Sequence, residues 1–395
     1  MSGRLAGGAV RAVLRRLRSG RIEVLEGGRR RGFGPAAAEL RATVTINDPA
    51  AWRGPLRGSL GLGEAYVDGG WDCDDLVALF RIAARELREY RGLRAAVARP
   101  RGALHRLRHQ VPDSTPSRAR ANISAHYDLG NELFASFLDK RMMYSCAYFP
   151  SPGASLEEAQ LAKLERICER LRLGPETHLL EIGSGWGGMA VHAAANHGCR
   201  VTTTTISHEQ HALALERVRK AGLEQRVTVL LEDYRDLRGS YDRLVSIEMI
   251  EAVGWRDFDR YFRQCSDLLA ADGLMLLQAI TIDDRLYEAE KGARSFANTH
   301  VFPGGCLPSN RLIADCLARV TDLRQVWSED ITAHYPPTLA AWRQRFHAAW
   351  ERLRGRGYDE RFHRLWDFYL CSSEAGFRER RIGDMQALMA KPGWS

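Results

Sequence analysis

The stretch that decides the fold is "LLEIGSGWGG", residues 179–188. Its apolar beginning is typical of a buried strand, and Gly183, Gly185 and Gly187 follow just before an amphipathic helix is predicted to begin. Glycines at a strand-to-helix turn allow a tight bend and let a ligand approach the backbone N–H groups. The stretch therefore predicts a ligand-binding loop at the carboxyl end of a strand.

Short apolar segments alternate with amphipathic ones from about residue 155 onward. Strands are predicted at 178–183, 200–206, 226–233, 243–249 and 273–282, and helices at 155–173, 187–197, 208–220 and 256–269. The first helix opens with Ser155 and Glu158 at capping-box spacing. This alternation indicates an α/β domain with a doubly wound, largely parallel sheet, which binds ligands beyond the carboxyl ends of its strands.

The residues around the glycine loop favour S-adenosylmethionine (SAM) over a dinucleotide. Glu181 lies just before the glycines, which gives the form E-x-G-x-G-x-G that SAM enzymes show. A carboxylate suits the sulfonium and ammonium groups of SAM, whereas it would repel a pyrophosphate.

Polar residues also follow the next two predicted strands. Thr205, Ser207 and Gln210 could hydrogen-bond the ribose hydroxyls, although Ser207 is equally well placed to cap the following helix. Asp233 is positioned to accept a hydrogen bond from an adenine amine, and Tyr234 to pack on the adenine ring. These five residues are the predicted nucleoside contacts.

The length of 395 residues predicts two domains. We expect a smaller N-terminal α+β domain over residues 1–97, with a strand pair at 21–26 and 42–48. Its expected role is accessory, either lipid binding at the membrane surface or dimerisation. Residues 98–120 contain three prolines and many arginines and are predicted to be a basic linker. The catalytic domain is expected over residues 121–395.

The net charge of +8 is concentrated near the N-terminus, where residues 1–31 hold nine arginines. A basic surface favours nucleic acid or anionic lipid, or is simply the solvated surface of an arginine-rich chain. No nucleic-acid-binding signature is present, so we expect no nucleic-acid partner. The eight cysteines show no metal-ligand spacing, which predicts reduced thiols in the cytoplasm and no metal site.

Several longer motifs resemble one family, the cyclopropane-fatty-acyl-phospholipid synthases and their mycolic-acid-modifying relatives. The motifs, in family order, are "HYDLGNELFASFLDKRMMYSCAYF" (126–149), "LLEIGSGWGG", "TISHEQ" (205–210), "SIEMIEAVGW" (246–255), "VFPGGCLPS" (301–309) and "EAGFRERRIGD" (374–384). The resemblance covers about residues 55–395.

The resemblance implies a class I SAM-dependent methyltransferase fold, with a Rossmann-like mixed sheet and helices on both faces. It also implies a cytoplasmic enzyme, peripheral to the inner membrane and expected to be a homodimer, that acts on unsaturated phospholipid acyl chains at the membrane surface. In the family's reaction the alkene attacks the sulfonium methyl group, and the resulting carbocation loses a proton and closes to a cyclopropane. The alternative product is a methylene or methyl-branched chain, which would require a partner reductase, such as a flavin-dependent one.

The resemblance further implies roles for individual residues. Tyr144, Ser145, Ile206 and Ile247 correspond to SAM contacts. A bound bicarbonate serves as the base in family members, and the corresponding residues here are Cys146, Glu251, Gln278, Ile280 and Tyr335.

The chain departs from the family at two places near this group. Gln278 stands where many members have histidine, and Ala252 replaces a second histidine. Glutamine can donate a hydrogen bond but cannot relay a proton. Both the use of bicarbonate and the choice between the two products therefore stay open. Glu248 in the same motif has no family role, and we expect it to hydrogen-bond a neighbouring loop. His126 is as well suited to a structural role as to a base.

Overall fold

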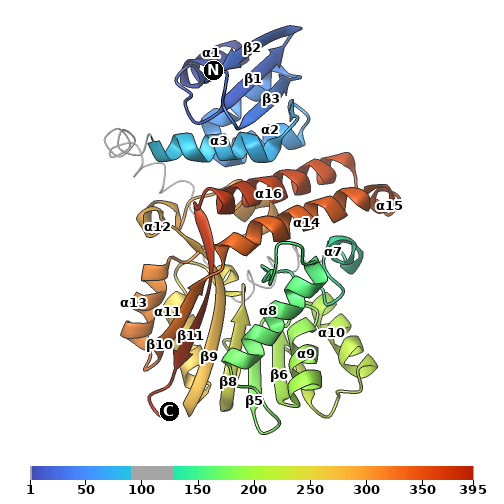
Figure 1. The fold of residues 1–395 in the computed structure, drawn as a ribbon, viewed down its shortest axis with the longest axis vertical. Coiled ribbons are helices and arrows are strands. Elements are labelled where there is room, and N and C mark those ends of the chain that lie inside the picture. Colours follow the sequence, from blue (N-terminus) through green and yellow to red (C-terminus); the bar gives the residue numbers. More distant parts are fainter. Residues whose placement is uncertain (1, 90–128, 395) are drawn as a thin grey trace. The chain divides into compact units, whose positions relative to one another are not determined.

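The computed structural model describes residues 2–89 and 129–394, and these divide into two compact units (Figure 1). The first unit consists of residues 2–89, Gly292–Val301 and Trp342–Arg381. The second consists of residues 129–291, 302–341 and 382–394. The predicted linker at 98–120 and His126 lie outside the described residues.

The first unit is built around a four-stranded sheet of order β2-β1-β3-β4. Its strands are β1 (Arg21–Glu26), β2 (Arg29–Phe33), β3 (Arg41–Ile46) and β4 (Trp71–Cys73), and its first helices are α1 (Gly3–Leu14), α2 (Gly58–Val67) and α3 (Leu76–Glu89). Short 3₁₀ segments, η1 (Pro49–Arg53) and η2 (Pro55–Arg57), precede α2. The predicted strand pair corresponds to β1 and β3, which lie side by side in parallel. The arginine-rich β2 carries no alternating pattern in the sequence, so it was not predicted.

Helices from the C-terminal part of the chain complete this unit. They are α15 (Trp350–Arg354) and α16 (Glu360–Arg378), together with the π-helical turn η4 (Ala297–Val301). Arg81 and Arg85 of α3 each bond the carboxylate of Glu379 at 2.8 Å, and Phe80 meets Phe368 of α16 edge-on. The compact unit therefore extends beyond the boundaries expected from the sequence, because residues distant along the chain pack together.

The second unit contains a seven-stranded sheet of order β10-β11-β9-β8-β5-β6-β7. Its strands are β5 (His178–Ile182), β6 (Arg200–Thr205), β7 (Val227–Leu231), β8 (Tyr241–Ile247), β9 (Leu269–Ile282), β10 (Arg324–Asp330) and β11 (Ile382–Ala390). β7, β6, β5, β8 and β9 are parallel, while β11 runs antiparallel to both β9 and β10. This confirms the predicted mixed α/β sheet; β10 and β11 were not foreseen as individual strands.

The helices of the second unit pack against the sheet (Figure 1). They are α7 (Asn131–Phe137), α8 (Leu156–Arg170), α9 (Gly188–His197), α10 (His208–Lys220), α11 (Phe258–Asp267), α12 (Asp284–Glu290) and α13 (Asn310–Val320). Two short 3₁₀ segments, η3 (Ile250–Ala252) and η5 (Thr332–His334), follow strands, and α14 (Tyr335–Ala348) begins here. The capping box predicted for α8 is present, since Glu158 accepts from the N–H of Ser155 at 2.8 Å.

Alternation along β9 explains why both faces of the sheet are covered. Met275 and Leu277 point into a core shared with α11 and α13, whereas Leu274 and Leu276 point into a core shared with α8, α9 and α10. A strand that is apolar on both sides requires helices on both sides. The polar residue Gln278 lies beyond this apolar part of β9, toward the carboxyl end of the strand.

No helix in residues 2–89 or 129–394 is both long and apolar enough to cross a bilayer.

Candidate active site

The glycine loop after β5 has the conformation that its sequence predicts. Gly183, Gly185 and Gly187 all have positive φ, at +97°, +49° and +84°. A Cβ atom at Gly183 would lie 3.0 Å from the Met249 side chain, and one at Gly187 would lie 3.2 Å from Ala214. A left-handed backbone conformation with other atoms this close favours glycine, because any Cβ atom would be strained and crowded. The loop then opens α9, whose N-cap residue is Gly187.

Glu181 is fully buried beneath this loop. Its carboxyl group accepts a hydrogen bond from the Thr203 hydroxyl at 2.6 Å. Burial raises the pKa of Glu181 to about 8, because the charged form is poorly solvated there. A cationic ligand beside it would favour the ionised form, which is the charge complement that the sequence predicts for SAM.

The predicted ribose contacts lie together but are bonded to one another. The Thr205 hydroxyl donates to Gln210 Oε1 at 2.8 Å, and the Gln210 N–H donates to Ser207 Oγ at 3.2 Å. Ser207 is thus the N-cap of α10, the alternative weighed from the sequence. Ile206 follows β6 directly, between these polar residues.

The predicted adenine contacts follow β7. Asp233 is buried and its two carboxylate oxygens accept from the Arg235 guanidinium at 2.8 and 2.6 Å. A carboxylate has further lone pairs, so this ion pair still leaves acceptor capacity. The Tyr234 ring packs edge-on against Tyr261, with centroids 5.6 Å apart.

Tyr144 and Ser145 belong to the loop between α7 and α8. The Tyr144 ring stacks on Phe302 with a centroid distance of 6.2 Å, and the Ser145 hydroxyl accepts from Lys163 Nζ at 2.6 Å. Ile247 is the last residue of β8 and lies opposite Gln278 of β9. These residues thus converge on the carboxyl ends of the central strands.

The five residues predicted to hold the base also converge there. The backbone N–H of Ile280 donates to Glu251 Oε1 at 2.5 Å, and Gln278 Nε2 lies 3.4 Å from the Cys146 carbonyl oxygen. Tyr335, the first residue of α14, is likewise within the group, but its hydroxyl hydrogen-bonds a residue to which the sequence assigned no chemical role.

That residue is Glu248, which accepts hydrogen bonds from three of the five predicted residues. Its Oε1 accepts from the Cys146 N–H and from Gln278 Nε2, each at 2.8 Å, and its Oε2 accepts from the Tyr335 hydroxyl at 2.6 Å. The expected bond to a neighbouring loop is therefore confirmed, and the loop is the one that contains Cys146. Glu248 also has a φ of +47°, a conformation that costs a residue with a side chain about 1 kcal/mol.

Gln278 is held in one amide orientation by the neighbouring strand. Gln386 of β11 lies opposite it in the antiparallel register and donates from Nε2 to Gln278 Oε1 at 3.1 Å. The Gln278 amide nitrogen therefore faces the carboxyl groups and its oxygen faces away from them.

Two buried residues of this group were missed by sequence reasoning. Lys163 of α8 is completely buried, and Asp384 of β11 accepts from Gln278 Nε2 at 3.2 Å. Each left a weak signal: Lys163 lies on the buried stripe with Leu164 and Ile167, and Asp384 interrupts an apolar strand. We call Cys146, Lys163, Glu248, Glu251, Gln278, Tyr335 and Asp384 the carboxyl cluster.

Burial governs the protonation of the carboxyl cluster. It raises the pKa of Glu251 to about 8, with the negative charge of Glu248 adding to the effect, and it raises the pKa of Asp384 and of Glu248. The Tyr335 hydrogen bond and the charge of Lys163 oppose the rise at Glu248. One buried oxygen of Glu251 and one of Asp384 have no hydrogen-bond partner among the described residues, whereas both oxygens of Glu248 accept hydrogen bonds.

These patterns assign the charge. A buried carboxyl group that accepts few hydrogen bonds favours its neutral form, whereas one that accepts three hydrogen bonds is stabilised as a carboxylate. One cation and one anion balance, so we assign the ionised state to Glu248, with Lys163 as its counter-charge and with Glu251 and Asp384 protonated.

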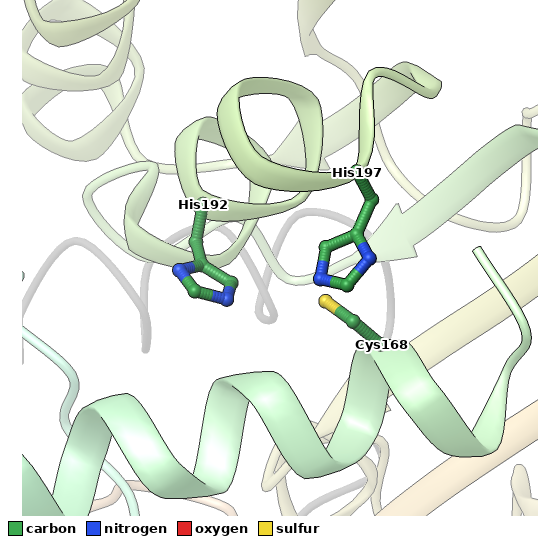
Figure 2. Close-up of side chains that lie close together, drawn as sticks. All are labelled: Cys168, His192 and His197. Atoms are coloured by element: carbon green, nitrogen blue, oxygen red, sulfur yellow. The ribbon is translucent and has the colours of Figure 1, made fainter. Parts of the chain in front are cut away.

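No member of the carboxyl cluster belongs to the group that could hold a metal ion in the described ranges. That group consists of Cys168, His192 and His197, on α8 and α9 (Figure 2). The sequence shows no metal-ligand spacing there, because the ligands come from two helices.

The sequence is similar to a known protein family and to individual members of it. A model of the family "Mycolic acid cyclopropane synthetase" matches residues 114–387. Tuberculostearic acid methyltransferase UfaA1 of Mycobacterium tuberculosis is 38% identical over 372 residues, which is 92% of this chain and 86% of that protein. The cyclopropane-fatty-acyl-phospholipid synthase of Escherichia coli is 38% identical over 371 residues, 91% of this chain and 89% of that protein.

A solved structure is similar as well. The mycolic acid cyclopropane synthase CmaA1, complexed with SAH and CTAB, aligns with a TM-score of 0.65 at 31% identity, covering 69% of this chain and 98% of that chain.

The raised pKa of Glu181 makes a prediction for stability. Between its ordinary pKa of 4.5 and its folded value of about 8, the folded protein retains a proton that the unfolded chain loses. The free energy of unfolding should therefore fall as pH rises through this window, by about 3 kcal/mol between pH 5 and pH 8. Glu181→Gln removes this loss, so its thermal midpoint relative to wild type should increase with pH.

The measurement is differential scanning fluorimetry of wild type and variant at both pH values without SAM. The matched control is Glu176→Gln, an exposed position just before β5. A midpoint difference for Glu181→Gln that does not change with pH would contradict the assignment.

Proposed function

The chain belongs to the mycolic acid cyclopropane synthetase family of SAM-dependent methyltransferases, and from that premise we propose which reaction it catalyses. The enzyme adds a one-carbon unit from SAM across the cis double bond of an unsaturated phospholipid acyl chain to form a cyclopropane fatty acid. The observation that supports this most directly is the carboxyl cluster at the carboxyl ends of β8 and β9, adjacent in the sheet to the strand that carries the glycine loop.

SAM supplies an electrophilic methyl group in such a reaction, and the residues around the glycine loop are proposed to bind it. A cationic ligand would favour the ionised form of Glu181, whose pKa burial raises to about 8. The positive φ values of the loop require glycines, which carry no side chain that could block a ligand. Asp233 is proposed to accept from the adenine amine, and Tyr144 and Ile247 to contact the adenosine.

Proton removal is the second requirement of the reaction. A cyclopropane forms only when the transferred carbon loses a proton, so a base must lie next to the methyl-transfer point. The sequence resemblance implies bicarbonate held by Cys146, Glu251, Gln278, Ile280 and Tyr335. The residues present do not fit that ion, because the Cys146 N–H, the Gln278 amide and the Tyr335 hydroxyl already donate to Glu248. The ionised carboxylate of Glu248 would also repel a second anion placed beside it.

The first unit is proposed to bring the enzyme to its substrate. Helix α1 carries Arg4 and Arg11, and its Leu5 and Val13 are exposed by 66% and 68%. Apolar side chains among arginines suit the surface of an anionic membrane. We therefore propose a cytoplasmic enzyme, peripheral to the inner membrane, whose N-terminal domain is an accessory lipid-binding domain; a homodimer is part of the same proposal.

A methylene or methyl-branched product is the second candidate. Two observations favour it: Gln278 replaces the expected imidazole, and a relative of equal identity is named a tuberculostearic acid methyltransferase. In that case the cation would lose a different proton, and a partner reductase, such as a flavin-dependent one, would be needed for a saturated methyl branch.

The test is incubation of the full chain with methyl-labelled SAM and vesicles of an unsaturated phospholipid that contain an anionic lipid. We expect label in the acyl chains and a mass increase of one CH2 group. Ozonolysis then separates the products, because a methylene chain is cleaved and a cyclopropane is not. Vesicles of the saturated phospholipid are the control and should remain unlabelled. Absence of label from both kinds of vesicle would contradict the proposed function.

A further inference from the structure

We propose that Glu248 is the built-in base of this enzyme and takes the place of an external anion. The inference rests on the proposed function and names the group that receives the proton. It begins from the poor fit of bicarbonate to residues that already hold a carboxylate.

The carboxylate of Glu248 occupies a position surrounded by hydrogen-bond donors, of the kind that would otherwise bind a free anion. Three donors converge on its carboxylate from three separate elements: the Cys146 N–H from the loop before α8, the Gln278 amide from β9 and the Tyr335 hydroxyl from α14. Two of the donors are fixed in direction, since one is backbone and Gln386 sets the orientation of the Gln278 amide. Converging, oriented donors keep a buried carboxylate ionised and in place.

The charges of the group leave Glu248 as the available acceptor. Lys163, buried beside Ser145, provides one positive charge, and Glu251 and Asp384 each have an oxygen without a partner among residues 2–89 and 129–394, as expected of neutral acids. A neutral acid cannot accept a proton from carbon, whereas the carboxylate of Glu248 can.

The backbone places this carboxylate where the chemistry occurs. Glu248 directly follows Ile247, the last residue of β8, and its left-handed φ of +47° turns the side chain toward Cys146 and Tyr335. Glycine would adopt this backbone at lower cost. The chain thus has glutamate at a position where glycine would be less strained, and the glutamate carboxylate makes three specific hydrogen bonds there.

Methyl transfer precedes proton removal in the proposed reaction. The alkene electron pair forms a bond to the methyl carbon as the carbon–sulfur bond breaks, which leaves S-adenosylhomocysteine and a carbocation. One C–H bond of the transferred carbon then breaks, and its electron pair closes the three-membered ring. The proton goes to Glu248, which becomes neutral, and is later released to solvent. No oxidant or reductant is consumed.

The experiment compares isosteric variants in the labelled-lipid assay. Glu248→Gln should lower kcat by at least about 100-fold, since general bases contribute on that scale, while SAM binding measured by calorimetry stays close to wild type. Glu251→Gln keeps a neutral side chain and should lower kcat less than Glu248→Gln does. The control is Glu224→Gln, an exposed change in the loop before β7.

A glycine variant tests the anion site directly. Glu248→Gly relieves the strained backbone and frees three donors, so added formate or bicarbonate should restore activity to this variant but not to Glu248→Gln. Wild-type activity should be the same in buffer depleted of carbon dioxide.

Failure of this inference is distinct from failure of the proposed function. Unlabelled lipid with the wild type contradicts the proposed function. An active wild type overturns the inference in any of three cases: if Glu248→Gln retains activity, if removal of bicarbonate abolishes activity, or if Glu248→Gly binds SAM but is rescued by neither anion.

A group of possible metal ligands lies between α8 and α9. We infer that Cys168, His192 and His197, with Glu165, form a site for a divalent transition metal, most suitably zinc. Cys168 projects from α8 toward the two histidines of α9 (Figure 2), and the three donor atoms all lie within 4.8 Å of one another.

Glu165 supplies a fourth ligand. It lies one turn before Cys168 on α8, and its carboxylate oxygens are 3.1 Å from His192 Nε2 and 3.2 Å from His197 Nε2. Zinc takes four such ligands in a tetrahedron, with donor atoms about 3.2–3.8 Å apart. The Glu165–histidine distances are already close to this range. The donor atoms of Cys168, His192 and His197 lie within 4.8 Å of one another, so metal binding requires them to move closer together.

Asn196 holds the His192 ring from the opposite side. Its side-chain nitrogen lies 3.0 Å from His192 Nδ1 and donates to the His192 carbonyl oxygen at 3.0 Å. The other ring nitrogen, Nε2, therefore faces Glu165.

The site lies at the end of α9 that is distant from the glycine loop. α9 begins beside Gly187 of the glycine loop, and His197 is its tenth and last residue, about 15 Å along the helix. A metal here would join α8, which carries Lys163, to α9, which extends from the glycine loop. Its role would be structural.

Cobalt binding tests this site without reference to activity. The purified full chain, stripped with a chelator, should bind a single equivalent of Co²⁺ with a thiolate-to-cobalt charge-transfer band, and Zn²⁺ should displace it and raise the thermal midpoint. Cys168→Ser should abolish the band, and His197→Ala should weaken binding at least tenfold. The control is Cys265→Ser, at a buried cysteine in α11, which should change neither the charge-transfer band nor the cobalt affinity. Absence of cobalt binding, or a band that survives Cys168→Ser, would overturn the inference.

Discussion

The burial of three carboxyl groups around one lysine is the constraint on which the second unit depends. Each charge removed from water costs several kcal/mol unless donors or a counter-charge compensate it. Here the compensation comes from a loop backbone, an amide on β9, a hydroxyl on α14 and the ammonium group of α8. Elements that are far apart in sequence are thus tied together at one point, and each of them fixes a group that the others require.

The sheet determines where this point lies. The apolar alternation at the start of β9 commits both of its faces to helix packing, and its buried polar residue, Gln278, lies in its second half, toward the carboxyl end. The parallel strands β5 and β8 are neighbours, and therefore the glycine loop and Glu248 leave the sheet at the same edge. The order of the strands therefore places the loop proposed to bind SAM next to the residue proposed to accept the proton.

The sequence predicted the parallel strands, the glycine loop and the capping box of α8 because each has a local pattern. It also brought Cys146, Glu251, Gln278, Ile280 and Tyr335 to one place through the motifs. Lys163 and Asp384 could not be assigned in this way, since their partners lie far along the chain and burial alone makes them significant. The packing of α16 with the N-terminal segment was missed for the same reason. Glu248 was noticed, but its role depends on three donors that no local pattern reveals.

The bond from Gln386 to Gln278 has a consequence for how this site could have evolved. Gln278 receives a hydrogen bond on its oxygen and gives one from its nitrogen to Glu248, and an imidazole could do both only in one tautomer and ring orientation. An exchange of Gln278 for histidine would therefore be tolerated best if Gln386 and Glu248 changed as well. The hydrogen bonds couple these three positions, so the residue tolerated at one of them depends on the residues at the other two.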